Sequence, residues 1–252
     1  MSDATLQTTK LSVRFGGLLA VDNVDLDCRP GELTGLIGPN GAGKTTFIDA
    51  ITGFLPKNAT GSTRFDGEEV MGLAPHKLAH RGLCRTWQML ELFDDISVRA
   101  NLDVASSRLT PMKAFTDYFR GSDVDDRIES TLELLNLSEV ADRSPSELSQ
   151  GQRKLVGVGR ALVADAKLLL LDEPAAGLDR QETVWLGLQL RRIVESGTPI
   201  LMVDHDMGLV LSVSDRIHVL EFGKLIASGA PGEIRKDERV IAAYLGGSGG
   251  DE

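Results

Sequence analysis

Short runs of apolar residues alternate with longer amphipathic segments along most of the chain. Three runs have the length and composition of buried strands, namely 33–37, 167–172 and 198–203. Helices are expected to begin near Lys44 and to cover 127–137, 180–196 and 238–245. Because apolar strands are separated by helices, the pattern predicts an α/β fold with a mainly parallel sheet.

Other regions depart from this strand and helix alternation. Near the start, alternating residues predict strands over 11–15 and 24–28, followed by one over 63–67, and a hairpin is expected at 217–221 and 225–228. From about 89 to 162 the pattern is helical, which indicates an inserted lobe. Within it, 106–126 is predicted to be a loop or short-helix insertion without an assigned task. The Gly-rich end, 246–252, is expected to be a flexible tail.

Composition narrows the class of protein further. The 252 residues carry a net charge of -10, and 42% are hydrophobic, which suits one large domain and disfavours nucleic acid as a partner. No apolar run approaches the roughly 20 residues of a membrane helix, and the polar first ten residues do not predict a signal peptide. Cys28 and Cys84 are interpreted as reduced, structural thiols of a cytosolic protein.

The first chemical motif is a glycine-rich loop between a buried strand and a helix. Residues 38–45 read Gly-Pro-Asn-Gly-Ala-Gly-Lys-Thr and match the GxxxxGK[ST] pattern of phosphate-binding loops. Glycines let backbone N–H groups approach a triphosphate, and the following helix places its positive dipole end beneath it. Lys44 is expected to reach the β- and γ-phosphates of ATP, and the Thr45 hydroxyl to bind Mg²⁺. A chance glycine-rich turn is the alternative.

The second motif is a pair of carboxylates at the end of a buried strand. Four leucines, 168–171, run directly into Asp172 and Glu173. Ligands bind at the carboxyl edge of open α/β sheets, so Asp172 is predicted to hold Mg²⁺, and Glu173 to act as general base on the attacking water. The alternative is a strand that simply ends in solvent with two surface acids.

A third motif, Leu148-Ser149-Gln150-Gly151-Gln152, names a family. With the later Arg160-Ala161-Leu162, it resembles the LSGGQ signature of ABC transporter ATP-binding subunits. The resemblance spans about 6–245 as one ATPase domain. It implies a P-loop cassette with a parallel core sheet, an amino-terminal antiparallel β subdomain and a helical subdomain at about 89–162. In that family the signature contacts ATP bound to the opposite subunit. Gln150 replaces the commoner Gly, and a plain helix cap is the alternative interpretation.

Other site residues follow from the resemblance. Phe15 stands where the family stacks an aromatic ring on adenine, although core packing is the alternative. Gln88 resembles the glutamine that touches Mg²⁺ and senses the membrane partner. Asp179 lies in a D-loop-like segment across the dimer interface, and His205 resembles the switch histidine at the γ-phosphate. The expected nucleotide-binding set is Phe15, Gly38, Pro39, Asn40, Gly41, Ala42, Gly43, Lys44, Thr45 and Thr46.

Within the family, several segments resemble the ATP-binding subunits of branched-chain amino-acid importers, a group that also contains urea and amide importers. They are Phe15-Gly16-Gly17, Arg85-Thr86-Trp87-Gln88, 172–178, His205-Asp206-Met207 and Ala243-Tyr244-Leu245-Gly246. Trp87 and Asp204 depart from that pattern, which has Phe and Glu there. The resemblance implies a second cassette as partner, with a heterodimer expected, and integral membrane permease subunits. It also implies an extracytoplasmic solute-binding protein and a peripheral position on the cytoplasmic face of the membrane.

Three rival functions remain at this point. A soluble ABC ATPase acting on DNA or ribosomes shares these motifs but usually carries two cassettes, a coiled-coil insertion or basic segments. A nucleotide kinase lacks the signature, and an exporter cassette remains possible. His76 and His80 have i, i+4 spacing that could suit a metal, but no third ligand is near in sequence, so they are interpreted as a polar helix face.

Overall fold

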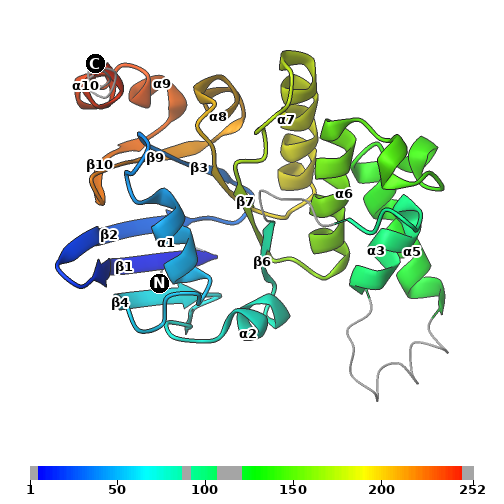
Figure 1. The fold of residues 1–252 in the computed structure, drawn as a ribbon, viewed down its shortest axis with the longest axis horizontal. Coiled ribbons are helices and arrows are strands. Elements are labelled where there is room, and N and C mark those ends of the chain that lie inside the picture. The colour runs from blue at the N-terminus through cyan, green and yellow to red at the C-terminus, as the bar shows by residue number, and fades with distance from the viewer. Residues whose placement is uncertain (1–4, 87–91, 107–120, 246–252) are drawn as a thin grey trace.

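The computed structural model of the protein describes residues 5–86, 92–106 and 121–245. Figure 1 shows two sheets side by side, with a group of helices at the far end of the larger sheet. The smaller sheet is antiparallel, in the order β2-β1-β4-β5. Its strands are β1 (Leu6–Phe15), β2 (Leu18–Cys28), β4 (Ala59–Phe65) and β5 (Glu68–Glu69). The expected antiparallel β subdomain is therefore confirmed.

The larger sheet has six strands in the order β10-β9-β3-β8-β7-β6. All neighbours pair in parallel except β9 and β10, which form the predicted antiparallel hairpin. The strands are β3 (Leu33–Ile37), β6 (Leu83–Thr86), β7 (Leu168–Asp172), β8 (Ile200–Val203), β9 (Arg216–Glu221) and β10 (Lys224–Gly229).

Helices cover this larger sheet and build the lobe at its β6 side (Figure 1). They are α1 (Lys44–Ile51), α2 (Pro75–His80), α3 (Val98–Ser106), α5 (Gly121–Leu134), α6 (Gln150–Val163), α7 (Arg180–Glu195), α8 (Met207–Val213), α9 (Pro231–Ile234) and α10 (Glu238–Leu245). Two short 3-10 turns, η1 (Ser138–Val140) and η2 (Pro145–Glu147), precede α6. Within the described ranges, no helix is both long and apolar enough to cross a membrane.

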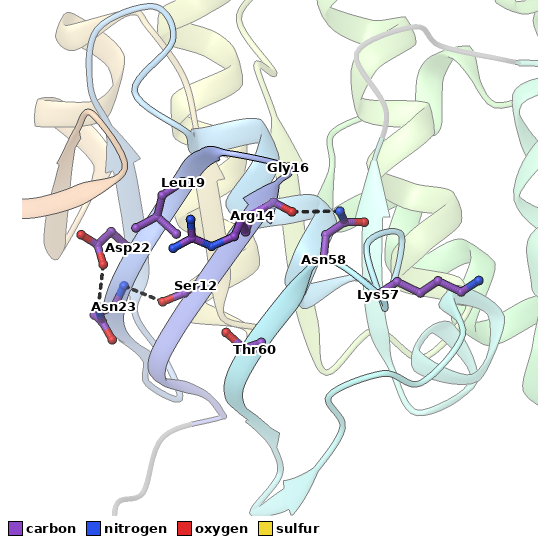
Figure 2. A pocket seen from close by; sticks show the side chains of 9 residues that line it. All are labelled: Ser12, Arg14, Gly16, Leu19, Asp22, Asn23, Lys57, Asn58 and Thr60. Atoms are coloured by element: carbon purple, nitrogen blue, oxygen red, sulfur yellow. Dashed lines mark hydrogen bonds between the residues drawn. The ribbon is translucent and has the colours of Figure 1, made fainter.

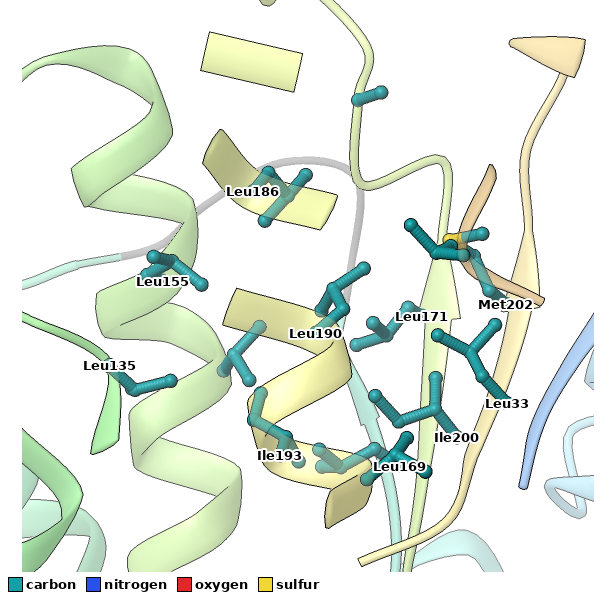
Figure 3. Packing of buried hydrophobic residues seen from close by; sticks show 14 of the residues in the cluster. Leu33, Leu135, Leu155, Leu169, Leu171, Leu186, Leu190, Ile193, Ile200 and Met202 are labelled. Atoms are coloured by element: carbon teal, nitrogen blue, oxygen red, sulfur yellow. The ribbon is translucent and has the colours of Figure 1, made fainter. Parts of the chain in front are cut away.

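The core has two parts because the central strands bury both faces. Leu169, Leu171 and Ile200 pack against α6 and α7 on one face, as Figure 3 shows. Leu168 and Leu170 point the other way and join the apolar face of α1 and the antiparallel sheet. Successive strand residues face opposite sides, so a continuous run of leucines is the expected sequence for a strand covered on both faces.

Several element boundaries differ from those predicted. The helix over 127–137 begins earlier, at Gly121, and ends at Leu134, because Asn136 adopts a positive φ of 55° that a helix cannot hold. Part of the 106–126 insertion is therefore helical, whereas 107–120 and the expected tail 246–252 lie outside the described residues. Strand β6 was not predicted at all. His76 and His80 are exposed on α2, as expected for a polar face.

A buried histidine in the larger sheet gives a pH-dependent stability. His218 lies on β9 with 2% exposure, and burial lowers its pKa from 6.5 to about 4. Between these two pKa values, His218 is protonated in the unfolded chain and neutral in the folded chain. Stability is full above pH 6.5 and falls as the pH drops towards 4. The loss is about 3 kcal/mol, from 1.36 kcal/mol per pKa unit.

Urea unfolding at pH 7 and pH 4.5, compared between the parent protein and His218→Gln, measures this loss. The carboxylate contributions are common to both proteins, so the parent is expected to lose more stability than the variant. Equal losses in the two proteins would contradict the assignment to His218.

Candidate functional site

The phosphate loop, residues 38–43, joins β3 to α1 in a conformation that depends on glycine. Gly43 has a φ of 101°, and a Cβ there would lie 2.5 Å from the carbonyl oxygen of Ala20. At Gly38, φ is 153° and a Cβ would lie 2.1 Å from the carbonyl oxygen of Leu220. Gly43 caps α1 without a side chain, and the first turn of α1 has no acidic residue. The helix therefore presents its N–H groups and positive dipole end to an anion.

Lys44 lies across this loop. Its Nζ donates to the carbonyl oxygens of Gly38 at 2.6 Å and Pro39 at 3.0 Å, and the residue is 9% exposed. Burial lowers the pKa of Lys44, while the nearby carboxylates of Glu173 and Asp172 act in the opposite direction. The predicted phosphate-binding lysine and the two predicted acids therefore share one site, although 128 positions separate Lys44 from Asp172 in the sequence.

The two carboxylates leave the end of β7 in different directions. Asp172 Oδ2 accepts from Arg85 Nη2 at 2.7 Å, and Arg85 also donates to Asp49 Oδ1 at 2.5 Å. Glu173 adopts a positive φ of 48°, and its N–H donates to the carbonyl oxygen of Val203 at 2.7 Å. This backbone turn separates the two neighbouring carboxylates, so they can have different roles.

His205 follows β8 and lies beside Glu173. Its Nδ1 is 3.7 Å from Glu173 Oε2 and 3.7 Å from Asp204 Oδ1, and its side chain is 62% exposed. Asp204 is completely buried and accepts from the backbone N–H groups of Ala175 and Asp206, at 3.0 and 2.9 Å. Asp204 therefore ties the segment after β8 to the segment after β7, which sets the position of His205 relative to Glu173.

The signature segment lies at the start of α6, on the helical side of the molecule. Ser149 caps the helix, and its Oγ accepts from the N–H of Gln152 at 3.3 Å while Gln152 Oε1 accepts from the N–H of Ser149 at 3.1 Å. Ser149 and Gln150 are exposed. Within the described part of the chain, no hydrogen bond joins 149–152 to the phosphate loop. Ser149 and Gln150 are therefore accessible at the start of α6.

Asp179 caps α7 and is connected to the signature through Glu182. Asp179 Oδ1 accepts from the N–H groups of Gln181 and Glu182, at 2.7 and 2.8 Å. Glu182 Oε1 in turn accepts from the N–H of Gly151 at 3.2 Å. Glu182 was not predicted as part of the site, although an Asp followed three residues later by Glu is the sequence pattern of a capping box.

Phe15 ends β1 and is 41% exposed, so its ring is available for stacking. A separate groove of about 470 Å³ begins beside it on the antiparallel sheet and includes Arg14 and Gly16. Figure 2 shows the groove residues, which come from β1, the turn between β1 and β2, β2, β4 and the segment before β4. None of them belongs to the predicted nucleotide-binding set, so this groove is distinct from the phosphate loop.

One predicted residue cannot be placed, and one unpredicted residue joins the site. Gln88 lies outside the described residues. Lys154, one turn into α6, donates from Nζ to the backbone oxygen of Glu173 at 3.5 Å. Burial lowers the pKa of Lys154, and the carboxylates of Asp204 and Glu173 oppose that shift. Its contact with a residue 19 positions away depends on how α6 packs, which no local sequence pattern encodes.

Comparison with known proteins defines the family. Residues 21–176 match the family model described as ABC transporter, and 224–249 match the model described as branched-chain amino acid ATP-binding cassette transporter. The chain therefore belongs to the ABC transporter ATP-binding family, whose members hydrolyse ATP to power transport.

Two relatives and one solved structure show which members of the family this chain resembles. The chain is 40% identical over 254 residues to the high-affinity branched-chain amino acid transport ATP-binding protein BraF of Pseudomonas aeruginosa, covering 98% of this chain and 99% of the relative. It is also 40% identical to LivG of Escherichia coli K12, a protein with the same description, at the same coverage. A crystal structure of an ABC transporter cassette in its ADP conformation superposes with a TM-score of 0.84 and 30% identity, covering 97% of this chain and 100% of that one.

Proposed function

We propose that ATP is bound and hydrolysed between two cassettes. Phe15, residues 38–46, Asp172, Glu173 and His205 form one half of each site, and the predicted role of Gln88 belongs to the same half. The signature segment 149–152 of the other cassette, in which Ser149 and Gln150 are exposed, forms the second half. The observation that carries this proposal is the exposure of Ser149 and Gln150 at the N-terminus of α6, because a helix N-terminus that is open to solvent can receive the phosphates of a nucleotide held by a partner.

The residues present fit Mg²⁺ beside the nucleotide. Mg²⁺ prefers oxygen ligands and is usually held by one or two carboxylates together with substrate phosphates. Thr45 at the start of α1 and Asp172 at the end of β7 provide the hydroxyl and carboxylate, and Lys44 lies near Asp172. A metal held there would supply positive charge that neutralises the phosphates of ATP. Thr45, Asp172 and Gln88 are the proposed ligands.

Hydrolysis then depends on two groups of this chain. Glu173 accepts a proton from the water that attacks the γ-phosphate, and His205 contacts the terminal phosphate. The backbone N–H groups of the phosphate loop and Lys44 neutralise the charge that builds up on the phosphates. Breaking the γ-phosphate contact with the opposite signature releases the two cassettes from one another.

We further propose that this cycle drives a membrane importer. The relatives named above are branched-chain amino acid transport proteins, which supports branched-chain amino acids or related small polar solutes as cargo. Residues 6–245 would act as one ATPase domain on the cytoplasmic face of the membrane. The partners would be a second, related cassette and integral membrane permease subunits, and a solute-binding protein would deliver the cargo from outside.

Capture of partners from native membranes tests this proposal. Tagged Glu173→Gln protein, which should retain ATP without hydrolysing it, is purified from its own cells with ATP and Mg²⁺ present, and the bound proteins are identified by mass spectrometry. A second ATP-binding chain and membrane permeases are expected, and both should be absent with Lys44→Ala. Recovery of ribosomal or DNA-bound proteins in their place would support the soluble ATPase instead.

A further inference from the structure

Arg85 connects the two elements that carry the proposed magnesium ligands. It lies on β6 with a side chain that is only 6% exposed. One terminal nitrogen donates to Asp49 on α1 at 2.5 Å, and the other donates to Asp172 at the end of β7 at 2.7 Å. Its guanidinium also lies 6.0 Å from the centre of the Phe54 ring.

The position of Asp49 makes this bridge relevant to the metal. Thr45 and Asp49 are four residues apart on α1, so they lie on the same face of the helix, one turn from each other. An arginine that holds both Asp49 and Asp172 therefore fixes the face of α1 that bears Thr45 relative to the end of β7.

We propose that Arg85 is a positioning residue for Mg²⁺, acting by fixing the Asp172 carboxylate and its distance from Thr45. This inference rests on the proposed role of Thr45 and Asp172 as magnesium ligands. Arg85 occupies Asp172 Oδ2, so the carboxylate has one orientation, and Oδ1 is the oxygen that we expect to face the metal or its water.

Arginine suits this task for a geometric reason. Its planar guanidinium presents several N–H donors in a fixed fork, whereas lysine offers a single compact charge on a flexible stem. Two carboxylates on different elements can thus be held by one side chain. Outer groups that orient a metal ligand typically change metal affinity or activity about 10- to 100-fold when they are removed.

A purely structural role makes a different prediction. If Arg85 only ties α1 to the sheet, its removal lowers thermal stability and leaves the magnesium dependence of nucleotide binding unchanged. Positioning of Asp172 instead predicts a weaker response to Mg²⁺, with nearly unchanged binding of ATP when Mg²⁺ is removed. Binding and stability are therefore measured separately.

The test uses the Glu173→Gln protein, in which ATP persists during the measurement. ATP binding is followed by calorimetry over a series of Mg²⁺ concentrations and in EDTA, and the melting temperature is recorded for each protein. Arg85→Gln is expected to raise the Mg²⁺ concentration for half-maximal effect about 10- to 100-fold. Arg85→Lys is expected to give a smaller increase, and Asp49→Asn, which keeps the side-chain shape, an increase in the same direction.

Arg81→Gln is the matched control, because Arg81 pairs with Glu68 on the exposed surface just before β6. It removes the same charge and should not change the magnesium response. An unchanged response in both Arg85→Gln and Asp49→Asn overturns the inference, even if the melting temperature falls. If ATP binding by the Glu173→Gln protein itself does not depend on Mg²⁺, the proposed magnesium site is wrong, which is a different result from failure of the role of Arg85.

Discussion

Lys44→Ala is expected to weaken ATP binding about 100-fold, which corresponds to about 3 kcal/mol. The side chain is almost buried in the phosphate loop, where its ammonium group lies against the carbonyl oxygens of Gly38 and Pro39. The Lys44→Ala substitution removes the ammonium group that would neutralise the charge of the triphosphate. Charge-assisted hydrogen bonds to phosphate are among the strongest in proteins, and water that enters the cavity replaces them poorly.

The loss is measured by calorimetric titration with a non-hydrolysable ATP analogue and Mg²⁺. Lys57→Ala is the control, because Lys57 is an exposed lysine in the segment between α1 and β4. It removes the same charge outside the phosphate loop and should bind the analogue as the parent does. A Lys44→Ala protein that folds normally and binds with unchanged affinity would refute the assignment of the loop.

Patterns that are local in sequence predicted most of the fold and provided most of the candidate site residues. The run 168–171 predicted a buried strand, and the structure places its alternate leucines in two different core clusters. The phosphate loop combines a strand, glycines and a helix within about a dozen residues, so its conformation is encoded locally. The signature could likewise be recognised as a segment that begins a helix.

Features that depend on tertiary contacts could not be predicted in this way. Strand β6 is only four residues long and contains Arg85, whose charge hides the strand pattern. The arginine is tolerated because Asp49 and Asp172, which are 36 and 87 positions away, meet it in the folded chain. Lys154 reaches Glu173 for the same kind of reason, through the packing of α6.

The role of Asp204, the buried residue after β8, becomes clear only when sequence and structure are considered together. The sequence showed Asp204 only as a departure from the branched-chain importer pattern. In the structure it is completely buried and accepts from two backbone N–H groups. Asp204 therefore connects the segments that carry Glu173 and His205.

Glu173→Gln is expected to lower the turnover number for ATP about 100- to 10,000-fold, the range typical for loss of a general base. Glutamine keeps the size of the side chain and its hydrogen-bonding capacity, but it cannot accept a proton from water. ATP affinity should change by less than about threefold, because catalysis and not ground-state binding is affected. Turnover is measured by phosphate release, and ATP-dependent pairing by size-exclusion chromatography with light scattering.

A double variant that includes His205 tests the same catalytic assignment in a second way. Its Nδ1 lies 3.7 Å from the Glu173 carboxylate, so the two groups are expected to act on the same water and phosphate. Effects of residues that act as a unit are strongly non-additive. The double variant Glu173→Gln/His205→Ala should therefore be about as slow as Glu173→Gln alone. Glu195→Gln, at the exposed end of α7, should retain full turnover. If Glu173→Gln also kept full turnover, the water would have to be activated by another group.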